Sequence, residues 1–288
     1  MVHILPEGEP VCGVTSFGGE IYVLRWKEIT ILEIEVYDAI TYRSQRCLPV
    51  PFSGRYTDMT SCEHNQCMYL SDAISDYVHK LDAVGQATQW AVNGQPRGLS
   101  VNDARLLVTF LVSIREFNSR GAFLREIHLP DTVINPWQAR QLTTGQFVLC
   151  QGDRGDAVRS VSIISADGRH IVHTHGGQNG PNTDQYEVPR HLAVDSNEYI
   201  FALDVVNRRV TLLSPTLEYV RDIVTPEQLS WFPYRMCLDV RRRRLYVTDS
   251  EYGNAGRVVV FAVHPDYVNS AFHPSGVGKS STSLSGSG

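Results

Sequence analysis

The stretch "VPRHLAVDSNEYIFALDVVNRRVTLLSP" (residues 188–215) decides the fold of this chain. Its short apolar and β-branched runs, at 192–194, 199–203 and 209–214, are separated by turn-forming Asp, Ser and Asn residues. Runs of this length and composition are typical of antiparallel strands joined by tight turns. A fourth run, at 218–223, completes a four-stranded meander of about forty residues, which is the size of one propeller blade.

The same pattern recurs along the chain, as a propeller requires, because one twisted sheet cannot bury both of its faces alone. Openings of the form Pro-x-x-apolar occur as PRGL (96–99), PRHL (189–192) and PYRM (233–236), with PWQA (136–139) and YTDM (56–59) as looser versions. The second strand recurs as EIYVLR (20–25), CMYLSD (67–72), RLLVTF (105–110), GQFVLC (145–150), EYIFALD (198–204) and RLYVTDS (244–250). Six such copies, spaced by about forty to fifty residues, predict an all-β, six-bladed propeller of four-stranded antiparallel blades.

The ends of the chain indicate how the ring closes. The sixth unit supplies only three strand-like runs before the Ser- and Gly-rich residues 270–288. The N-terminal run VHILP (2–6) resembles the fourth strands of other units, REIHLP (125–130) and RDIVTP (221–226). We therefore expect the N-terminal strand to complete the last blade, since a closed ring leaves no open sheet edge. The predicted propeller spans residues 1–269, and a disordered tail is expected after it.

The fifth unit resembles an NHL repeat. The pattern of that family is a Gly-rich loop, a Pro, a first and a second strand that each end in Asp, and Asn-x-Arg before the third strand. The matching positions are the Gly-rich residues 176–180, Pro189, Asp195, Asp204, Asn207 and Arg209. In the sixth unit, Asp249 and Arg257 stand in two of the corresponding places.

The resemblance implies structural roles for these residues and a recognition role for the propeller. An Asp at a strand end can accept hydrogen bonds from turn amides, and an Arg can link that Asp to a neighbouring strand. NHL propellers are often the C-terminal module of tripartite-motif ubiquitin ligases, where they recognise protein or RNA targets. The printed chain shows no RING-type cysteine and histidine ladder and no B-box, so we expect a ligase role to need a partner or an upstream region.

Composition favours a globular body that does not depend on a membrane. The chain has 288 residues, of which 42% are hydrophobic, and a formal net charge of −5. A ring of blades forms one domain at this length. No run of eighteen apolar residues and no secretory signal pattern is evident, so we expect a cytoplasmic protein without a membrane partner.

Two clusters look like metal sites but have too few ligands. Cys62 and Cys67 bracket a hairpin with His64 between them, and no second cysteine pair follows to complete a tetrahedral site. The three histidines of RHIVHTHGG (169–177) cannot all point to one face of an extended strand. We therefore expect reduced structural thiols, surface histidines, no bound metal and no cofactor.

Catalytic motifs are also missing from the sequence. The run HPSGVGKSS (273–281) resembles a phosphate loop, but His273 stands where the first glycine is needed. No nucleophile elbow and no Ser, His and acid arrangement is evident. We therefore predict that the chain is not an enzyme.

Blade geometry indicates where a partner would bind. In a propeller, the loops that enter each inner strand and the loops between second and third strands share one face, which we call the rim face. The predicted binding residues on this face are Tyr56, Arg97, Trp137, Arg190, Arg208, Tyr234 and Arg235. The run RRRR (241–244) falls on the opposite face.

Arg, Trp and Tyr are the residue types enriched in the hot spots of protein interfaces. Single-stranded RNA surfaces use the same types, but the net negative charge disfavours nucleic acid. We predict a non-enzymatic scaffold that recognises a protein or peptide through the rim face, and the resemblance to NHL repeats implies a role as the target-recognition module of a ubiquitin-ligase pathway. Single-stranded RNA binding on the same face is the alternative, and a propeller hydrolase or lyase with a channel metal is the third reading.

Overall fold

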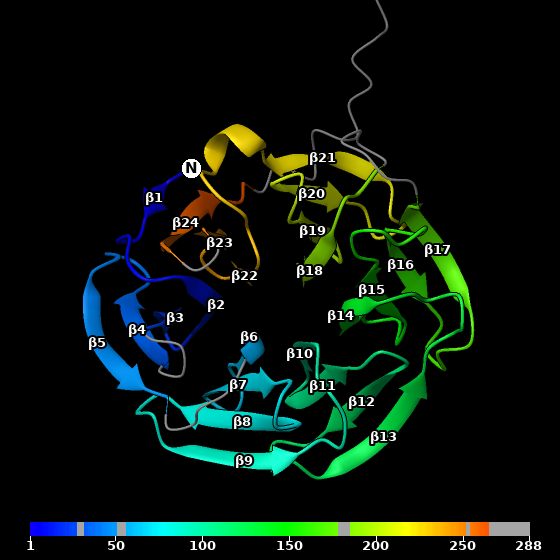
Figure 1. Cartoon of the computed structure of the whole chain (residues 1–288), viewed down its shortest axis with the longest axis horizontal. Helices are drawn as coiled ribbons and strands as arrows, with labels where there is room; N and C mark the ends of the chain where they lie inside the picture. The colour runs from blue at the N-terminus through cyan, green and yellow to red at the C-terminus, as the bar shows by residue number, and fades with distance from the viewer. Residues whose placement is uncertain (28–31, 51–55, 178–184, 252–253, 265–288) are drawn as a thin grey trace, which may run out of the picture.

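The computed structural model shows a closed ring of six four-stranded antiparallel sheets around a central axis (Figure 1). It describes residues 1–27, 32–50, 56–177, 185–251 and 254–264, with the side chains of residues 56 and 57 excepted. The predicted fold class is confirmed. In the described part of the chain, no helix is both long enough and apolar enough to cross a membrane.

The first three blades follow one another directly along the chain. Blade one comprises β2 (Val11–Phe17), β3 (Glu20–Trp26), β4 (Leu32–Asp38) and β5 (Ser44–Pro49). Blade two comprises β6 (Tyr56–Cys62), β7 (Cys67–Asp72), β8 (Tyr77–Asp82) and β9 (Ala87–Ala91). Blade three comprises β10 (Gly98–Asn102), β11 (Arg105–Thr109), β12 (Ser113–Phe117) and β13 (Phe123–His128).

The last three blades repeat this order, with the first strand innermost. Blade four comprises β14 (Pro136–Gln141), β15 (Phe147–Gln151), β16 (Ser160–Ile164) and β17 (Ile171–Gly176). Blade five comprises β18 (Pro189–Val194), β19 (Ile200–Asp204), β20 (Arg209–Leu213) and β21 (Tyr219–Val224). Blade six comprises β22 (Met236–Asp239), β23 (Arg244–Ser250), β24 (Gly256–Ala262) and the N-terminal β1 (His3–Ile4).

The N-terminal strand closes the ring, as the sequence predicts. His3 pairs with Val260 and Ile4 with Val259, so β1 is the outer strand of blade six. The backbone amide of Leu5 also donates to the Val258 carbonyl at 2.9 Å. This pairing covers the edge of β24 that would otherwise be open.

Arg25 of blade one stabilises this closure through hydrogen bonds. Its side chain is 1% exposed, and its Nη1 donates to the carbonyls of Glu9 at 2.7 Å and Gly256 at 2.8 Å. Its Nη2 donates to the Pro6 carbonyl at 2.8 Å, and its Nε pairs with the Glu35 carboxylate. One buried guanidinium therefore ties the N-terminal segment and blade six to blade one.

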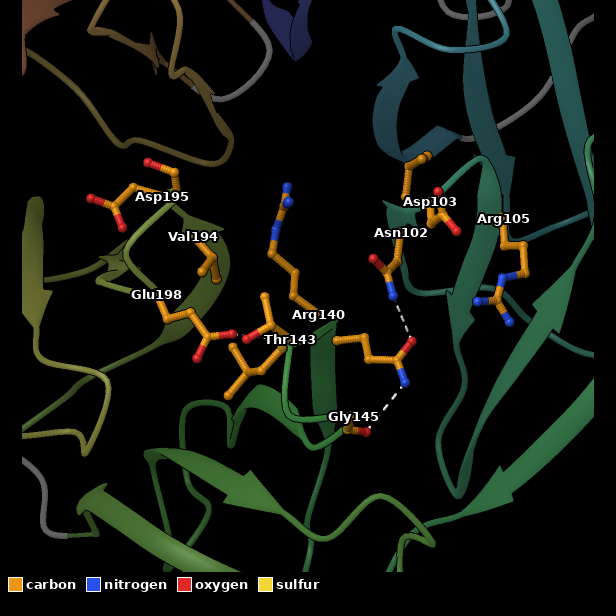
Figure 2. A pocket seen from close by; sticks show the side chains of 13 residues that line it. Asn102, Asp103, Arg105, Arg140, Thr143, Gly145, Val194, Asp195 and Glu198 are labelled. Atoms are coloured by element: carbon orange, nitrogen blue, oxygen red, sulfur yellow. Dashed lines mark hydrogen bonds between the residues drawn. The ribbon is translucent and has the colours of Figure 1, made fainter.

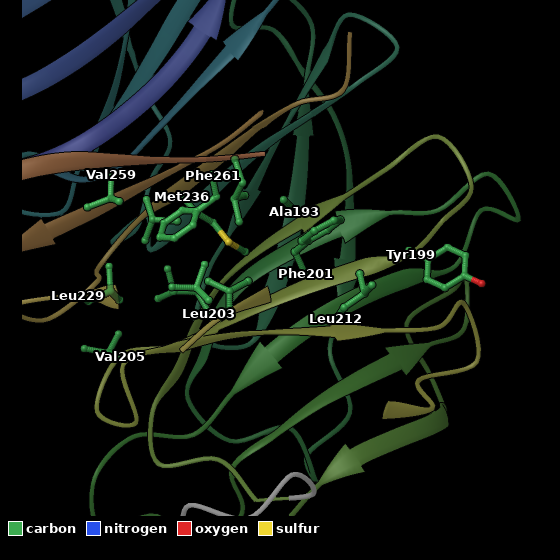
Figure 3. Packing of buried hydrophobic residues seen from close by; sticks show 14 of the residues in the cluster. Ala193, Tyr199, Phe201, Leu203, Val205, Leu212, Leu229, Met236, Val259 and Phe261 are labelled. Atoms are coloured by element: carbon green, nitrogen blue, oxygen red, sulfur yellow. The ribbon is translucent and has the colours of Figure 1, made fainter. Parts of the chain in front are cut away.

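Apolar side chains fill the spaces between neighbouring blades. Between blades five and six, Phe201, Leu203 and Leu212 pack in one cluster with Met236 and Val259 (Figure 3). Full burial of such a side chain stabilises the fold by about 1.5–3 kcal/mol. The period-two alternation of each strand thus supplies one apolar face to each neighbouring blade.

Candidate binding site on the rim face

The second and third residues of a blade opening occupy different positions, one at the rim of the channel and one toward its centre. In blades two, four and five the pairing of the inner strand skips the second residue of the opening, namely Thr57, Trp137 and Arg190. Such a β-bulge leaves the skipped residue unpaired and redirects its side chain. The third residue of each opening is paired with the second strand and lies toward the ring centre.

Four residues at the second opening position form a ladder along the rim of the channel. The guanidinium carbon of Arg190 lies 3.9 Å from the centroid of the Trp137 ring, and that of Arg97 lies 5.2 Å from it. Arg190 also lies 5.9 Å from the ring centroid of Tyr234. These distances are typical of cation–π contacts. We call Arg97, Trp137, Arg190 and Tyr234 the rim ladder, which runs across blades three to six.

Arg190 has the most strongly perturbed guanidinium of the ladder. Burial, followed by repulsion from Arg235, lowers the pKa of Arg190 to about 10. Its Nε and the Nε1 of Trp137 are buried and have no hydrogen-bond partner among the described residues. Unsatisfied buried donors of this kind are costly, so the ladder is a strained part of the rim.

Arg97 is held only weakly, by residues at the start of the neighbouring blade four. Its Nη1 lies 3.4 Å from both Asn135 Oδ1 and the Pro136 carbonyl. Burial lowers the pKa of Arg97, although Asp153 and Asp156 attract the guanidinium. The ladder is therefore cationic, with an acidic loop beside it.

A hollow of about 500 Å³ continues from the end of the ladder. Tyr234 belongs to both, and Arg208 lines the hollow. The remaining lining residues are Ser230, Trp231, Phe232 and Glu251. Phe232 is 41% exposed, so the hollow offers an apolar surface next to a cation.

Large apolar side chains are exposed over much of the same face. They come from loops between second and third strands and from loops that enter inner strands. In the described part of the chain, they are Ile74, Leu111, Val112, Ile134 and Phe232. Apolar groups beside arginines and aromatics are the composition of a protein-binding surface.

The third opening residues meet in the channel. Asp58 Oδ1 lies 3.2 Å from His191 Nε2 and 3.0 Å from Arg235 Nε, and its Oδ2 accepts from the Leu99 amide at 2.7 Å. Gln138 Nε2 lies 3.1 Å from His191 Nε2. We call Asp58, Gln138, His191 and Arg235 the channel cluster. Since blades two and five stand opposite each other in the ring, the contact between Asp58 and His191 crosses the channel (Figure 1).

Gly98 occupies the third opening position of blade three and has to be glycine. A Cβ atom there would lie 2.3 Å from the Trp137 carbonyl oxygen and 2.8 Å from Gln138 Cα. The missing side chain lets the inner strands of blades three and four approach closely. Gln138 can then donate to the Leu99 carbonyl at 2.8 Å.

Burial and charge together set the protonation of the channel cluster. Burial is the strongest influence on Asp58 and would raise its pKa, but His191 and Arg235 bring the pKa below its ordinary value. Burial lowers the pKa of His191 by more than Asp58 raises it. At neutral pH we therefore assign an ionised Asp58, a neutral His191 and a compensating charge on Arg235.

The expectation that Arg235 lies on the exposed rim is wrong. Arg235 is 7% exposed and faces Asp58, whereas Tyr234 occupies the position equivalent to Arg97 and Arg190. Tyr234, which the sequence also predicts on the rim, is the second residue of this opening and lies beside Arg190, whereas Arg235 is the third residue. A shift of one residue along a strand reverses the direction of the side chain.

The other predicted rim residues have simpler outcomes. Arg208 is half-buried and lines the rim hollow, as described above. Tyr56 begins β6, but its side chain lies outside the described part of the structure. The run 241–244 lies at the hairpin between β22 and β23, where Arg241 pairs with Glu63 and Arg242 with Asp239.

Asp204 organises the turn of blade five. It is fully buried and accepts from the amides of Val188 at 2.9 Å and Glu187 at 3.0 Å, and from Asn207 Nδ2 at 2.7 Å. Arg209 Nε lies 4.0 Å from its carboxylate. These contacts join the second strand to the segment that leads into the inner strand.

Blade six uses the equivalent Asp249 in a similar way. Asp249 accepts from the amides of Ser230 at 3.0 Å and Trp231 at 2.7 Å, and from Arg257 Nε at 2.9 Å. Asp195 instead caps a turn through the amides of Asn197 and Tyr199. The resemblance of these blades to NHL repeats stays a prediction.

The two metal-like clusters do not come together as sites. Cys62 and Cys67 are buried free thiols that face each other across a hairpin, and His64 is exposed. His173 is exposed on β17, and His175 packs edge-on against Tyr186. Within the described ranges, no three His, Cys, Asp or Glu side chains are arranged to hold a metal ion.

No protein-family model matches this chain, and no curated protein matches it in sequence. Solved structures with the same fold include a structural-genomics protein of unknown function from Bacteroides thetaiotaomicron. The two align with a TM-score of 0.65 and 12% identity, over 89% of this chain and 72% of that chain. At this identity the likeness shows the fold alone.

Two named structures are similar at the same level. Streptogramin B lyase aligns with a TM-score of 0.59 and 13% identity, over 92% of this chain and 89% of that chain. Hydrazine synthase of Kuenenia stuttgartiensis aligns with a TM-score of 0.59 and 15% identity, over 86% of this chain and 79% of that chain. Together with the sheet order, these structures define the chain as a six-bladed β-propeller.

Proposed function

We propose that this propeller is a non-enzymatic scaffold that recognises a protein or peptide through its rim face. The observation that carries the proposal is the stacking of Arg190 on Trp137 at 3.9 Å, with Tyr234 and Arg97 alongside. A partially desolvated Arg next to Trp and Tyr is the composition of an interface hot spot. An acidic or carbonyl-rich segment of a partner would accept hydrogen bonds from the Nη1 and Nη2 groups of Arg190.

Protein is favoured over single-stranded RNA by the surroundings of the ladder. Exposed Ile, Leu, Val and Phe side chains share the face, and the acidic residues Asp153 and Asp156 lie close enough to Arg97 to influence its pKa. A surface for a nucleic-acid backbone would be expected to carry a continuous positive potential. From the resemblance of the fifth unit to NHL repeats, we further propose that this target recognition serves a ubiquitin-ligase pathway of the cytoplasm.

A lyase is the second candidate, because the His191 and Asp58 pair lies in the channel of a fold that streptogramin B lyase shares. His191 is only 3% exposed, and its Nε2 is already in contact with Asp58 and Gln138. A general base must reach the proton that it removes. The binding function therefore fits the arrangement of this histidine better.

Capture of partners from native extract tests the proposal. The bait proteins are the wild type, a rim variant with Trp137→Ala and Arg190→Ala, and an opposite-face control with Arg241→Ala and Arg243→Ala. We expect a protein that the wild type and the control retain and the rim variant loses, with or without ribonuclease. Loss of the captured protein after ribonuclease treatment would favour RNA binding. Equal capture by all three baits would contradict binding at the rim face.

A further inference from the structure

A second cavity opens on the face opposite the rim, at the hairpins that join the first and second strands of blades three, four and five (Figure 2). Its volume is about 440 Å³. Clefts of this size accommodate small-molecule ligands. The channel cluster lies further along the inner strands, because Gln138 precedes Arg140 by two positions on β14. This cavity is therefore separate from the rim face.

Arg140 is the central feature of this cavity. Figure 2 shows its side chain extended between Asp195 and Glu198 on one side and Asn102 on the other. Its Nε donates to the Leu192 carbonyl at 2.7 Å. Among the described residues, its guanidinium has no other hydrogen bond and no ion pair.

No carboxylate among the described residues forms an ion pair with Arg140. Burial lowers the pKa of Arg140, and Cys237 and then Asp58 oppose this. Asp58 is already engaged by His191 and Arg235 in the channel cluster. By contrast, the other arginine of the cavity, Arg105, is paired with Glu116 at 3.3 Å.

Three acidic residues, Asp103, Asp195 and Glu198, line the cavity and limit what can bind there. Asp195 Oδ1 accepts from two turn amides, and Glu198 Oε1 accepts from the Thr143 amide at 2.5 Å. Their charges repel a multiply charged anion, whereas their remaining oxygens can accept hydrogen bonds from a ligand. A ligand with a single negative charge limits the repulsion, and a donor group beside that charge can bond to the free carboxylate oxygens.

We propose that this cavity binds a small carboxylate that carries a hydroxyl or ammonium group next to its carboxyl group. The carboxylate pairs with the Nη1 and Nη2 groups of Arg140, which form the two-pronged geometry that carboxylates match. The hydroxyl or ammonium group faces the Asp195 and Glu198 side of the cavity. This site does not depend on the proposed partner binding, since it uses different blade loops on the other face.

Isothermal titration calorimetry with defined probes tests the site. The probes are L-lactate, glycine and L-alanine, with L-alaninamide as the uncharged-end control and inorganic phosphate as the multiply charged control. We expect at least one of the three acids to bind with one-to-one stoichiometry, and L-alaninamide not to bind. Arg140→Met should weaken that binding by about tenfold or more, whereas Arg243→Met, an exposed change on the same face, should not.

Arg140→Lys keeps a cation and tests the site even if Arg140→Met is poorly folded. We expect it to retain weaker binding, because an ammonium cannot form the two-pronged pair. The proposal is overturned if none of the three acids binds to the wild type, or if either Arg140 variant binds as tightly as the wild type. Tighter binding of phosphate than of any acid would also overturn the assignment to a carboxylate.

Discussion

Asp58 of blade two and His191 of blade five are in contact across the centre of the ring, with Oδ1 3.2 Å from Nε2, although 133 residues separate them in the chain. Arg235 of blade six joins the same carboxylate. A buried charge needs a partner, and here the partners come from blades that are not neighbours in sequence. The channel cluster therefore links distant blades, in addition to the apolar packing between neighbours.

The first prediction concerns the ion pair of this cluster. Asp58→Ala should destabilise the protein by about 3–5 kcal/mol, because it leaves the Arg235 charge buried without a carboxylate. Arg235→Met should have a cost of the same order. The double variant should cost less than the sum of the two single changes in urea denaturation. Simple additivity would show that the two side chains are not energetically coupled.

The second prediction is a pH dependence of stability that is due to His191. Burial lowers the pKa of His191 in the folded state, despite the contact with Asp58. The unfolded chain therefore binds a proton more readily, so stability falls as the pH decreases through the ordinary histidine value of about 6.5 toward the folded value. We expect His191→Gln to reduce this fall between pH 7.5 and pH 5.5 in denaturant titrations.

His64→Gln is the matched control for this experiment, because His64 is exposed. His79 is also buried with a lowered pKa, so some pH dependence should remain in the His191 variant. If the unfolding free energy of His191→Gln depends on pH as steeply as that of the wild type, the channel cluster does not lower the pKa of His191.

The third prediction concerns the closure of the ring. Arg25→Met removes three donors to backbone carbonyls of the N-terminal segment and blade six, and it leaves Glu35 without its buried partner. We expect a loss of about 3 kcal/mol in the free energy of unfolding. Deletion of residues 1–8 should also lower the melting temperature, since it exposes the edge of β24.

Arg46→Met is a suitable control on the same blade. Arg46 pairs with Glu20, but its side chain is 36% exposed, so this change should cost less than about 1 kcal/mol. Equal losses for Arg25→Met and Arg46→Met would contradict a special role of Arg25 in closure.

The architecture could be predicted from the sequence because each blade repeats local signals. Strand runs of four to six residues, turn residues and the Pro-x-x-apolar opening are all readable within about forty residues. The closing strand could be predicted as well, since residues 2–6 resemble the outer strands of other blades and β1 pairs with β24.

The channel cluster was missed because its contacts are formed only once the ring closes. Asp58, Gln138, His191 and Arg235 each stand at the third position of a blade opening, so an alignment of the openings carries the signal. The same alignment keeps Tyr234 on the rim and assigns Arg235 to the channel. The alignment does not show the β-bulges at Trp137 and Arg190. These bulges decide which residue of the opening points to the rim.

Arg140 could not be identified from its sequence context either. It stands in an ordinary strand position of β14, and its environment is formed by hairpins of three blades. Only the assembled ring shows that this arginine has no ion pair within the described part of the chain.

The central claim, that a partner binds at the rim ladder, is tested most directly by the affinity of a captured partner for single variants. Calorimetry should compare the wild type, Arg190→Ala and the opposite-face Arg243→Ala. We predict that Arg190→Ala raises the dissociation constant by about 30-fold, as expected for a hot spot of about 2 kcal/mol, and that Arg243→Ala leaves it unchanged. An unchanged dissociation constant for Arg190→Ala, or a large increase for Arg243→Ala, would contradict the assignment of the rim ladder as the binding site.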